Sequence, residues 1–394
     1  MVDAAAVLTR LTAESESMIA ETARLARIDS GSEDPAGVAA ACAALAELLT
    51  AGGWSTQPRS GGGLTATLSL GDGPRLLLLG HADTVWPAGT AAGWPPVREG
   101  GMLSGPGVGD MKGSLIMAAH AVAAARGAGL DGVGAIELLV VADEELGSPG
   151  SRPWIESRAR AAAACLGLEA GWPGGGVVVS RGAVGALTLR ARGRTAHCAG
   201  HDGAGASAVS ALAALIAPLE ALSRPAAGTL VSVGVFRGGV ARQVVPDLAE
   251  AMIDLRAPDH ERAEALLEEV RREVAAAPTG EVSLELTGGI TRPAMPPAVS
   301  RPLWELARAR AAELAIPLVP VSSRGGADAS FAGALGIPSL DGLGPICHDS
   351  CARGERIEVA SLAERAALMA LVICDLAAAW RGQARDSGNV DAPA

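Results

Sequence analysis

Apolar and polar positions alternate in blocks along the first half of the chain, and these blocks predict alternating strands and helices. Short continuous apolar runs, typical of strands buried on both faces, lie near 64–70, 75–80, 135–142 and 164–168. Apolar residues at helical spacing cover 14–28, 36–51 and 114–125. This order is typical of an α/β domain in which helices cover both faces of a sheet.

The pattern changes in the middle of the chain. A short strand near 177–181 leads out of the first domain, and 182–288 then read strand, helix, strand, strand, helix, strand. That βαββαβ order is the ferredoxin-like unit, so we predict an inserted α+β domain over 182–288. Expected helices at 301–314, 327–335 and 360–380 return the chain to a discontinuous first domain of 1–181 and 289–394, with a disordered tail at 382–394.

Composition and charge narrow the classes of function. A chain of 394 residues favours two domains, and a formal charge of -11 argues against nucleic acid as a partner. Residues 1–12 lack the pattern of a secretion signal, and the apolar stretch 366–380 is too short to cross a bilayer. Six cysteines without a disulfide framework indicate reduced thiols. We therefore expect a cytoplasmic protein without a membrane or nucleic-acid partner.

Candidate metal ligands follow the predicted strands. His81 and Asp83 come directly after 75–80. Side chains at i and i+2 of an extended segment point the same way, so Asp83 can hold one ring nitrogen of His81 while the other binds a metal ion. Asp110 follows the glycine-rich stretch 105–109 and precedes a predicted helix.

Three further strand ends carry ionisable residues. Asp143, Glu144 and Glu145 follow 135–142, and adjacent carboxylates repel one another unless a cation or proton compensates them. Glu169 follows 164–168, and His348 follows another short strand. Functional groups gather at the carboxyl ends of strands in open α/β sheets. Two histidines and three carboxylates suit two divalent ions that share one carboxylate, with zinc favoured by imidazole and oxygen ligands.

These segments, in this order, resemble the metallopeptidase family that contains glutamate carboxypeptidase, succinyl-diaminopimelate desuccinylase, acetylornithine deacetylase and aminoacylase, the M20 group. The resemblance covers nearly the whole chain. It implies an α/β, mixed-sheet zinc-peptidase catalytic domain with an inserted domain that serves for dimerisation and as a lid. It also implies a homodimer that acts on small peptides or N-acyl amino acids.

The resemblance implies a role for each residue of the site. One zinc ion would be held by His81, Asp110 and Glu169, and the other by Asp110, Glu145 and His348, with Co²⁺ or Mn²⁺ as substitutes. Glu144 would be the general base and acid, and Asp83 the partner of His81. A cis peptide is expected at Asp110–Met111. Cys347 and Cys351 flank His348, but the carboxylates already supply enough ligands, so we expect both cysteines to be small apolar residues.

The predicted reaction is hydrolysis of an amide bond, in which metal ions activate water and Glu144 moves its proton. Arg256 and Arg292 match positions near the substrate carboxylates in glutamate-specific relatives, and Glu169 also favours a carboxypeptidase over a deacylase. We therefore predict release of a C-terminal glutamate-like amino acid. The alternative for either arginine is a surface ion pair.

Other functions remain open from the sequence. An N-acyl amino acid deacylase, or a hydrolase that releases an amino acid from a carrier, would use the same metal chemistry. A catalytically silent binding relative would lose ligands or the base, which this chain retains.

Three features of the inserted domain bear on the substrate. His197 lies in a segment that matches the family's lid, where a histidine stabilises the oxyanion, although a surface histidine is the alternative. Gln243 stands where the family usually has an asparagine near the substrate. His201 and Asp202 either contact substrate or belong to a solvated loop.

Overall fold

The computed structural model describes residues 2–59, 61–200 and 204–388, which divide into two compact units. Unit 1 comprises Met1–Ser180, Pro296–Ser322 and Ala327–Ala394, and unit 2 comprises Arg181–Met295 and Ser323–Gly326. The predicted insertion of 182–288 lies inside unit 2. Unit 2 also contains the end of the strand Ser283–Arg292 and the short loop Ser323–Gly326. The predicted tail begins at 382, whereas the last helix continues to Gly388.

Unit 1 is built on a mixed six-stranded sheet in the order β1-β2-β6-β3-β7-β16. The strands β6, β3, β7 and β16 are parallel, and β1 and β2 run antiparallel to their neighbours. The sheet strands are β1 (Ser55–Pro58), β2 (Leu64–Ser69), β3 (Arg75–His81), β6 (Ala135–Val141), β7 (Ala164–Gly167) and β16 (Ser339–Leu340). Smaller sheets contain β4 (Val97–Glu99), β5 (Met102–Ser104), β8 (Gly176–Arg181), β15 (Val319–Ser323), β17 (Cys347–His348) and β18 (Arg356–Glu358).

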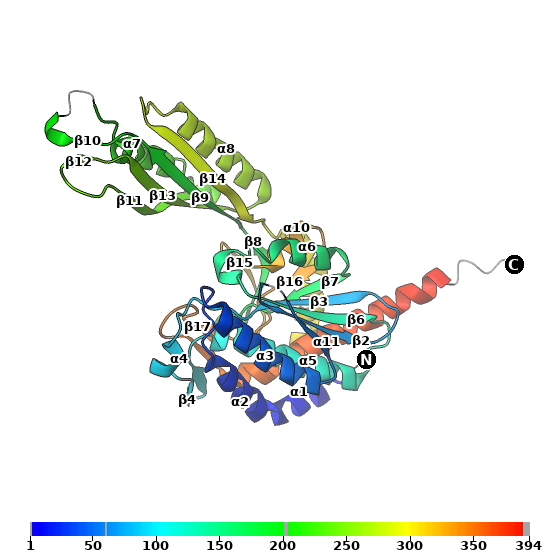
Figure 1. Ribbon diagram of the computed structural model, residues 1–394. Helices are drawn as coiled ribbons and strands as arrows, with labels where there is room; N and C mark the ends of the chain where they lie inside the picture. Colours follow the sequence, from blue (N-terminus) through cyan, green and yellow to red (C-terminus); the bar gives the residue numbers. More distant parts are fainter. Residues whose placement is uncertain (1, 60, 201–203, 389–394) are drawn as a thin grey trace. The chain divides into compact units, whose positions relative to one another are not determined.

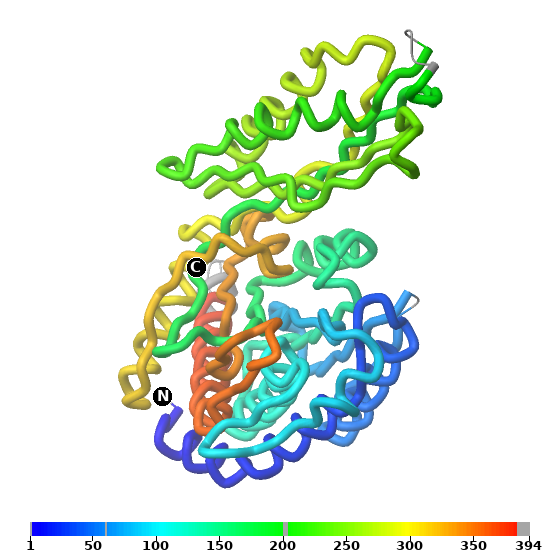
Figure 2. Tube along the Cα trace, turned by 90° about the vertical axis from the view of Figure 1, so that its left-hand side faces the viewer, coloured from blue at the N-terminus to red at the C-terminus, as the bar shows by residue number. Residues whose placement is uncertain are grey.

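Helices cover both faces of this sheet, as the sequence pattern predicts (Figure 1). Helix α11 packs against α5 and α1, which Figure 2 shows as neighbours from distant parts of the chain. The helices of unit 1 are α1 (Ala4–Ala13), α2 (Ser15–Ala26), α3 (Pro35–Ala51), α4 (Thr90–Gly93), α5 (Gly113–Ala128), α6 (Arg152–Arg160), α9 (Pro297–Leu314), α10 (Ala329–Ala334) and α11 (Val359–Gly388). No helix in the described part of the chain has the length and apolarity needed to cross a membrane.

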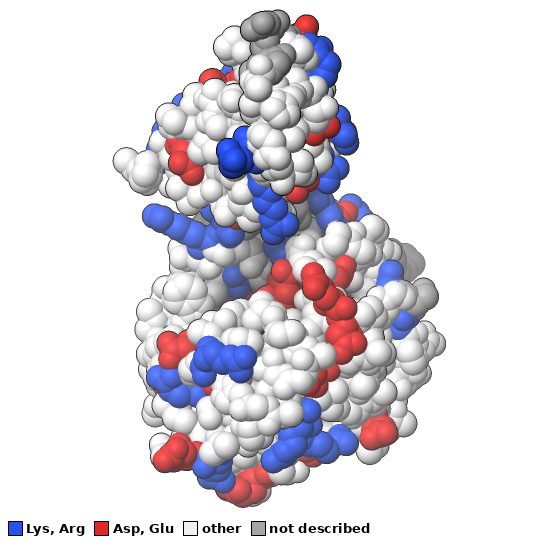
Figure 3. Space-filling model, turned by 60° about the vertical axis from the view of Figure 1, so that its left-hand side comes forward, with Lys and Arg blue, Asp and Glu red and all other residues white. Residues whose placement is uncertain are grey.

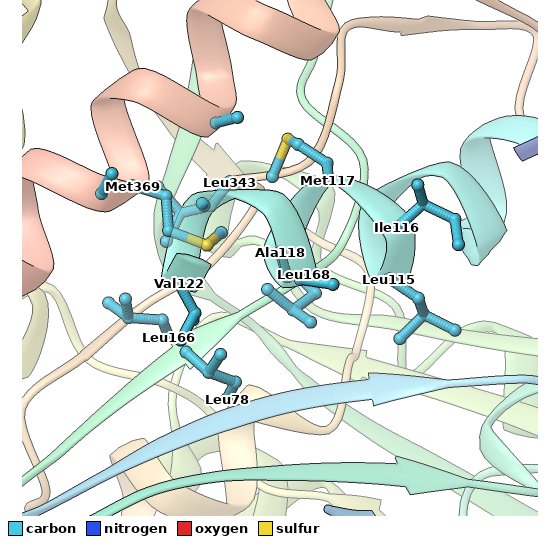
Figure 4. Close-up of a cluster of buried hydrophobic side chains, with 14 of the residues drawn as sticks. Leu78, Leu115, Ile116, Met117, Ala118, Val122, Leu166, Leu168, Leu343 and Met369 are labelled. Carbon is cyan, nitrogen blue, oxygen red and sulfur yellow. The ribbon is translucent and has the colours of Figure 1, made fainter. Parts of the chain in front are cut away.

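Alternation along β3 places leucines in two separate cores. Leu76 and Leu78 belong to the larger core, which α5 and α11 share (Figure 4). Leu77 and Leu79 face the opposite way and pack with residues of α6 and α10. Because β3 is buried on both faces along its length, its backbone is held firmly where the strand ends at His81.

Unit 2 has the strand order β11-β13-β9-β14 with every pair antiparallel, and two helices pack against the sheet. Together with the chain order this is the predicted ferredoxin-like arrangement. Asp259 and Ser207 accept backbone hydrogen bonds at the starts of its two helices. The elements are β9 (Ala183–Arg192), β10 (Ala196–His197), α7 (Ala208–Glu220), β11 (Leu230–Gly238), β12 (Val244–Val245), β13 (Leu248–Ala257), α8 (His260–Ala276) and β14 (Ser283–Arg292).

Candidate metal centre

Three predicted ligands from three separate segments meet at the carboxyl end of the unit 1 sheet. His81 is the last residue of β3, Glu169 follows β7, and Asp110 lies in the turn before α5. One donor atom from each of the three lies within 4.8 Å of the others. We call this set the first group. These three residues could hold a divalent ion, which would then keep a position for water or substrate, as catalytic zinc sites do.

The ring of His81 is held in an orientation suited to a ligand. Its Nδ1 donates to the backbone oxygen of Asp83 at 2.9 Å, so Nδ1 carries the hydrogen, and its Nε2 lies 3.1 Å from Oδ1 of Asp110. The Asp83 carboxylate is further from Nδ1, at 3.4 Å. The sequence predicts that the Asp83 carboxylate fixes the His81 ring. In the structure the backbone oxygen of Asp83 makes the shorter contact.

The Asp83 carboxylate has a second task. It accepts hydrogen bonds from the backbone N–H groups of Glu144 and Glu145, each at 3.1 Å, and from Oγ of Ser32 at 2.7 Å. Although burial opposes its ionisation, the contacts with His81 and Ser32 lower the pKa of Asp83. A buried, ionised Asp83 thus ties the end of β3 to the turn that carries the two glutamates.

Asp110 belongs to two groups of potential ligands. Its second group contains Glu145 and Cys351, whose donor atoms and one of Asp110 also lie within 4.8 Å of one another. We call this set the second group. Asp110 thus contributes a potential donor atom to both groups, and the peptide bond that follows it is cis, as expected from the resemblance.

His348 does not join either group among the residues that the structure describes. It lies in β17, and its Nε2 is 2.8 Å from Oε1 of Glu358 in β18. The role of His348 as a ligand stays a prediction, and the geometry does not support it. The sequence assigned His348 from its place after a short strand and from the family resemblance, and Cys351 was expected to be a small apolar residue. The expectation for Cys351 is wrong, because its thiol is exposed and lies 3.1 Å from Oδ2 of Asp110.

Charge is concentrated and poorly compensated in this site. Burial, with Asp110 and Glu144 nearby, raises the pKa of Glu169 well above its usual range. Burial, with Asp110 and Asp83 nearby, raises the pKa of Glu145 to about 7. For Asp110 burial acts in the same direction, but the hydrogen bond and charge of His81, together with contacts from Cys351 and Ser350, outweigh it and lower the pKa to about 2. Divalent ions would relieve this repulsion, so the donor set fits metal binding.

Two residues that the sequence reasoning missed hold the segment around Asp110. Oε1 of Glu355 accepts from the backbone N–H of Gly109 at 2.9 Å and of Asp110 at 3.2 Å. Nζ of Lys112 donates to the backbone oxygen of Ile28 at 2.7 Å. Burial raises the pKa of Glu355 to about 7 and lowers that of Lys112 to about 8. No periodicity marks either residue, because each acts through the backbone of a distant segment.

Comparison with known proteins decides the family. A sequence model of Peptidase family M20/M25/M40 matches residues 77–375, which include every ligand of both groups. The chain belongs to this family. It is a hydrolase of the metallopeptidase and amidohydrolase type, and M20 enzymes generally bind metal ions.

Individual M20 relatives span more than one activity. The chain is 28% identical to Carboxypeptidase G2 from Pseudomonas sp. (strain RS-16), over 93% of this chain and 91% of the relative. It is 34% identical to Succinyl-diaminopimelate desuccinylase from Methylobacterium sp. (strain 4-46), over 55% and 59%. The fold resembles that of aminopeptidase PepT from Bacillus cereus, with a TM-score of 0.73 at 24% identity, over 92% of this chain and 99% of that one.

The predicted substrate residues of this M20 chain lie in unit 2. Arg256 in β13 and Arg292 in β14 are both in register with Val184 of β9, one on each side. Nε and Nη2 of Arg256 donate to the two carboxylate oxygens of Asp254 at 2.7 and 2.8 Å. Arg256 therefore forms the ion pair that was the alternative to a role in substrate binding.

His197 and Gln243, which were also predicted to act on the substrate, lie in or next to the paired strands β10 and β12. His197 is exposed in β10, with Nδ1 accepting from the backbone N–H of Ala199 at 3.1 Å. Gln243 precedes β12, and its backbone oxygen accepts from Cys198 N–H at 3.0 Å. His201 and Asp202 lie outside the described residues.

Proposed function

We propose that the protein is a zinc-dependent carboxypeptidase that releases a C-terminal glutamate-like amino acid from an amide. The observation that supports the metal chemistry is the convergence of His81, Asp110 and Glu169 on one small volume, with Glu145 beside Asp110. Zinc ions there would lower the pKa of a water molecule and polarise the scissile carbonyl. Co²⁺ and Mn²⁺ suit the same ligands.

Glu144 is the residue that we propose for proton transfer. Its backbone N–H is fixed by Asp83, and its charge is close enough to raise the pKa values of both His81 and Glu169. Consecutive side chains diverge, so Glu145 can bind metal while the Glu144 carboxylate faces the reacting water. Glu144 takes a proton from that water onto a carboxylate oxygen and returns it to the leaving nitrogen.

The preference for a free carboxylate on the substrate is supported by the two arginines of unit 2. Arg256 and Arg292 flank Val184 from neighbouring strands, so their side chains begin about 10 Å apart along the sheet. Guanidinium groups bind carboxylates through two hydrogen bonds. Because both carboxylate oxygens of Asp254 already accept from Arg256, a substrate carboxylate would have to compete with Asp254 there.

The test is a panel of amides that differ in one charge. Zinc-supplemented protein would be assayed with C-terminal glutamate, aspartate and neutral residues, with the matched carboxamides, and with N-acetyl and N-succinyl amino acids. The proposal predicts highest kcat/KM for the glutamate amide. Arg292→Ala should lower kcat/KM about ten- to a hundredfold on this substrate, because a charged hydrogen bond is worth roughly 1.5–3 kcal/mol, and should cost little on the carboxamide.

A deacylase is the second candidate, favoured by the desuccinylase relatives. Equal losses on the acid and the carboxamide, or preference for an N-acyl amino acid, would move the assignment to that class.

We also propose that unit 2 serves for dimerisation and as a lid. Strand β11 lies at the edge of its sheet and exposes Leu230 and Phe236, which would favour pairing with a second copy. Light scattering of the purified protein tests this, and a monomer that is active at all concentrations contradicts it.

A further inference from the structure

A cysteine occupies the position beside Asp110 and Glu145 where the sequence reasoning expected a histidine. Sγ of Cys351 lies 3.1 Å from Oδ2 of Asp110 and 4.0 Å from Oε1 of Glu145. One donor atom from each of the three lies within 4.8 Å of the others. A thiolate with two carboxylates is a mixed sulfur and oxygen donor set of the kind that zinc accepts.

The loop around Cys351 is built to hold the thiol in this place. Cys351 and Asp349 have φ angles of 58° and 53°, which non-glycine residues seldom adopt. Asp349 forms an ion pair with Arg356, whose Nη1 also donates to the Gly354 backbone oxygen at 2.9 Å. Unfavourable backbone conformations that the surroundings maintain cluster at functional sites.

Asp110 receives a second contact from the same loop. Oγ of Ser350 donates to Oδ2 of Asp110 at 2.8 Å, the same oxygen that the Cys351 thiol contacts. Oδ1 of Asp110 faces His81. The two oxygens of one carboxylate are therefore directed to different groups, as a bridging ligand requires.

His348 is engaged elsewhere. Its backbone pairs with Arg356 in the small sheet, and its Nε2 contacts Glu358. In the described ranges, no set of three converging metal donors includes His348.

We propose that Cys351, and not His348, is the third protein ligand of the second metal ion, together with Asp110 and Glu145. The inference rests on the proposed function, because it assigns a ligand within the same site. Binding exchanges the thiol proton for the metal ion, and the proton leaves to solvent. Three protein ligands again leave one coordination position for water or substrate.

The wild-type protein itself offers the first test. Cys198 and Cys351 are the exposed cysteines of the described chain, and the other four are buried. Alkylation at alkaline pH, followed over time by peptide mass spectrometry, should modify Cys198 readily and Cys351 slowly but measurably in chelated protein, because burial and the carboxylates of Asp110 and Glu145 raise the pKa of the Cys351 thiol. After reconstitution with Zn²⁺ or Co²⁺, Cys351 should be protected and Cys198 should react as before, because a coordinated thiolate is withdrawn from reaction.

Spectroscopy and metal analysis of matched variants provide the second test. Co²⁺-loaded wild type should show a sulfur-to-cobalt charge-transfer band in the near ultraviolet, and Cys198→Ser and His348→Ala should keep it. Cys351→Ser should lose the band. Its affinity for the second ion should fall by more than roughly 100-fold, because loss of a hydrogen-bond partner of a ligand costs roughly 10–100-fold and loss of a ligand costs more. Cys351→His should bind two ions without the band.

The outcomes separate this inference from the proposed function. A hydrolase with two bound ions, no charge-transfer band and an unprotected Cys351 overturns the cysteine ligand and leaves the proposed function standing. Loss of the second ion in His348→Ala, with Cys351→Ser unaffected, also overturns it. A protein that binds no divalent ion contradicts both.

Discussion

The two groups that share Asp110 differ in how the fold supports their other members. In the first group His81 is the last residue of β3 and Glu169 lies just after β7, two parallel strands of the central sheet, and His81 is 1% exposed. In the second group Glu145 lies in a short turn after β6, and Cys351 is exposed on a loop between two short strands. Ligands on rigid elements are placed more accurately than ligands on loops, so we expect the first group to bind its ion more tightly than the second.

The same difference explains what the sequence could reveal. Apolar runs that end in His81 and Glu169, and the run before Glu145, predicted a convergence at the carboxyl edge of the sheet, because parallel strands bring their ends together. Cys351 could not be found in this way. Its approach to Asp110 depends on two left-handed residues and the Asp349–Arg356 pair, and neither produces a periodic pattern.

The fold shows a similar division. Most strands and helices with continuous or periodic apolar positions were predicted within a few residues, including the βαββαβ order of unit 2. The helices α1 and α6 were not predicted. The four-stranded sheet of β17, β18, β5 and β4 was missed because its strands have two or three residues and alternate too briefly to be recognised. This small sheet carries the loop that bears Cys351.

The largest effect is expected from the residue that both groups share. Asp110→Ala should release both ions and lower kcat by more than about 10³-fold, since metal activation contributes several kcal/mol. The measurement is the metal content of each variant by mass spectrometry. In the comparison variant, Glu169→Ala, the first group should lose its ion and the second group should retain most of its ion. If Asp110→Ala retains two ions, metal binding at the two groups does not depend on Asp110.

Glu144→Gln should stop chemistry without emptying either group. Proton transfer by a positioned carboxylate contributes about 10²–10⁴-fold, and kcat should fall by that factor while metal content stays at the wild-type level. Asp143→Asn is the matched control, because Oδ2 of Asp143 accepts from the backbone N–H groups of Gly150 and Ser151. If both variants lose activity equally, the acidic turn acts through its structure rather than through Glu144.

His197 in unit 2 should stabilise the transition state without affecting metal binding at either group. His197→Ala should lower kcat about 10²–10³-fold, with a smaller change in KM, because an oxyanion donor acts mainly in the transition state. His260→Ala, which removes another histidine of unit 2, should keep wild-type kinetics. If the donor comes from a partner subunit, mixed dimers of His197→Ala and Glu144→Gln should regain activity, and a verified mixed dimer that remains inactive excludes donation across subunits.

The smallest effect concerns the stability of the metal-free protein. The pKa of Glu145 rises from 4.5 to about 7 on folding, so between these values the folded state binds more protons than the unfolded state, and the contribution of Glu145 to stability falls as pH rises. Metal-free Glu145→Gln should therefore gain in Tm over the wild type as pH increases from 5 to 8. Zinc should reverse the order at pH 8 by stabilising only the wild type at the second group. A constant difference in Tm across this range would mean that Glu145 is not protonated in the folded, metal-free protein.

Metal dependence tests the central claim most directly. Protein would be stripped with a strong chelator, dialysed, and assayed on the C-terminal glutamate amide before and after addition of Zn²⁺ or Co²⁺, with bound metal measured in the same samples. The account predicts no turnover without metal and recovery that follows the ions bound, up to two per chain. Full activity in protein shown to be free of divalent ions would contradict it.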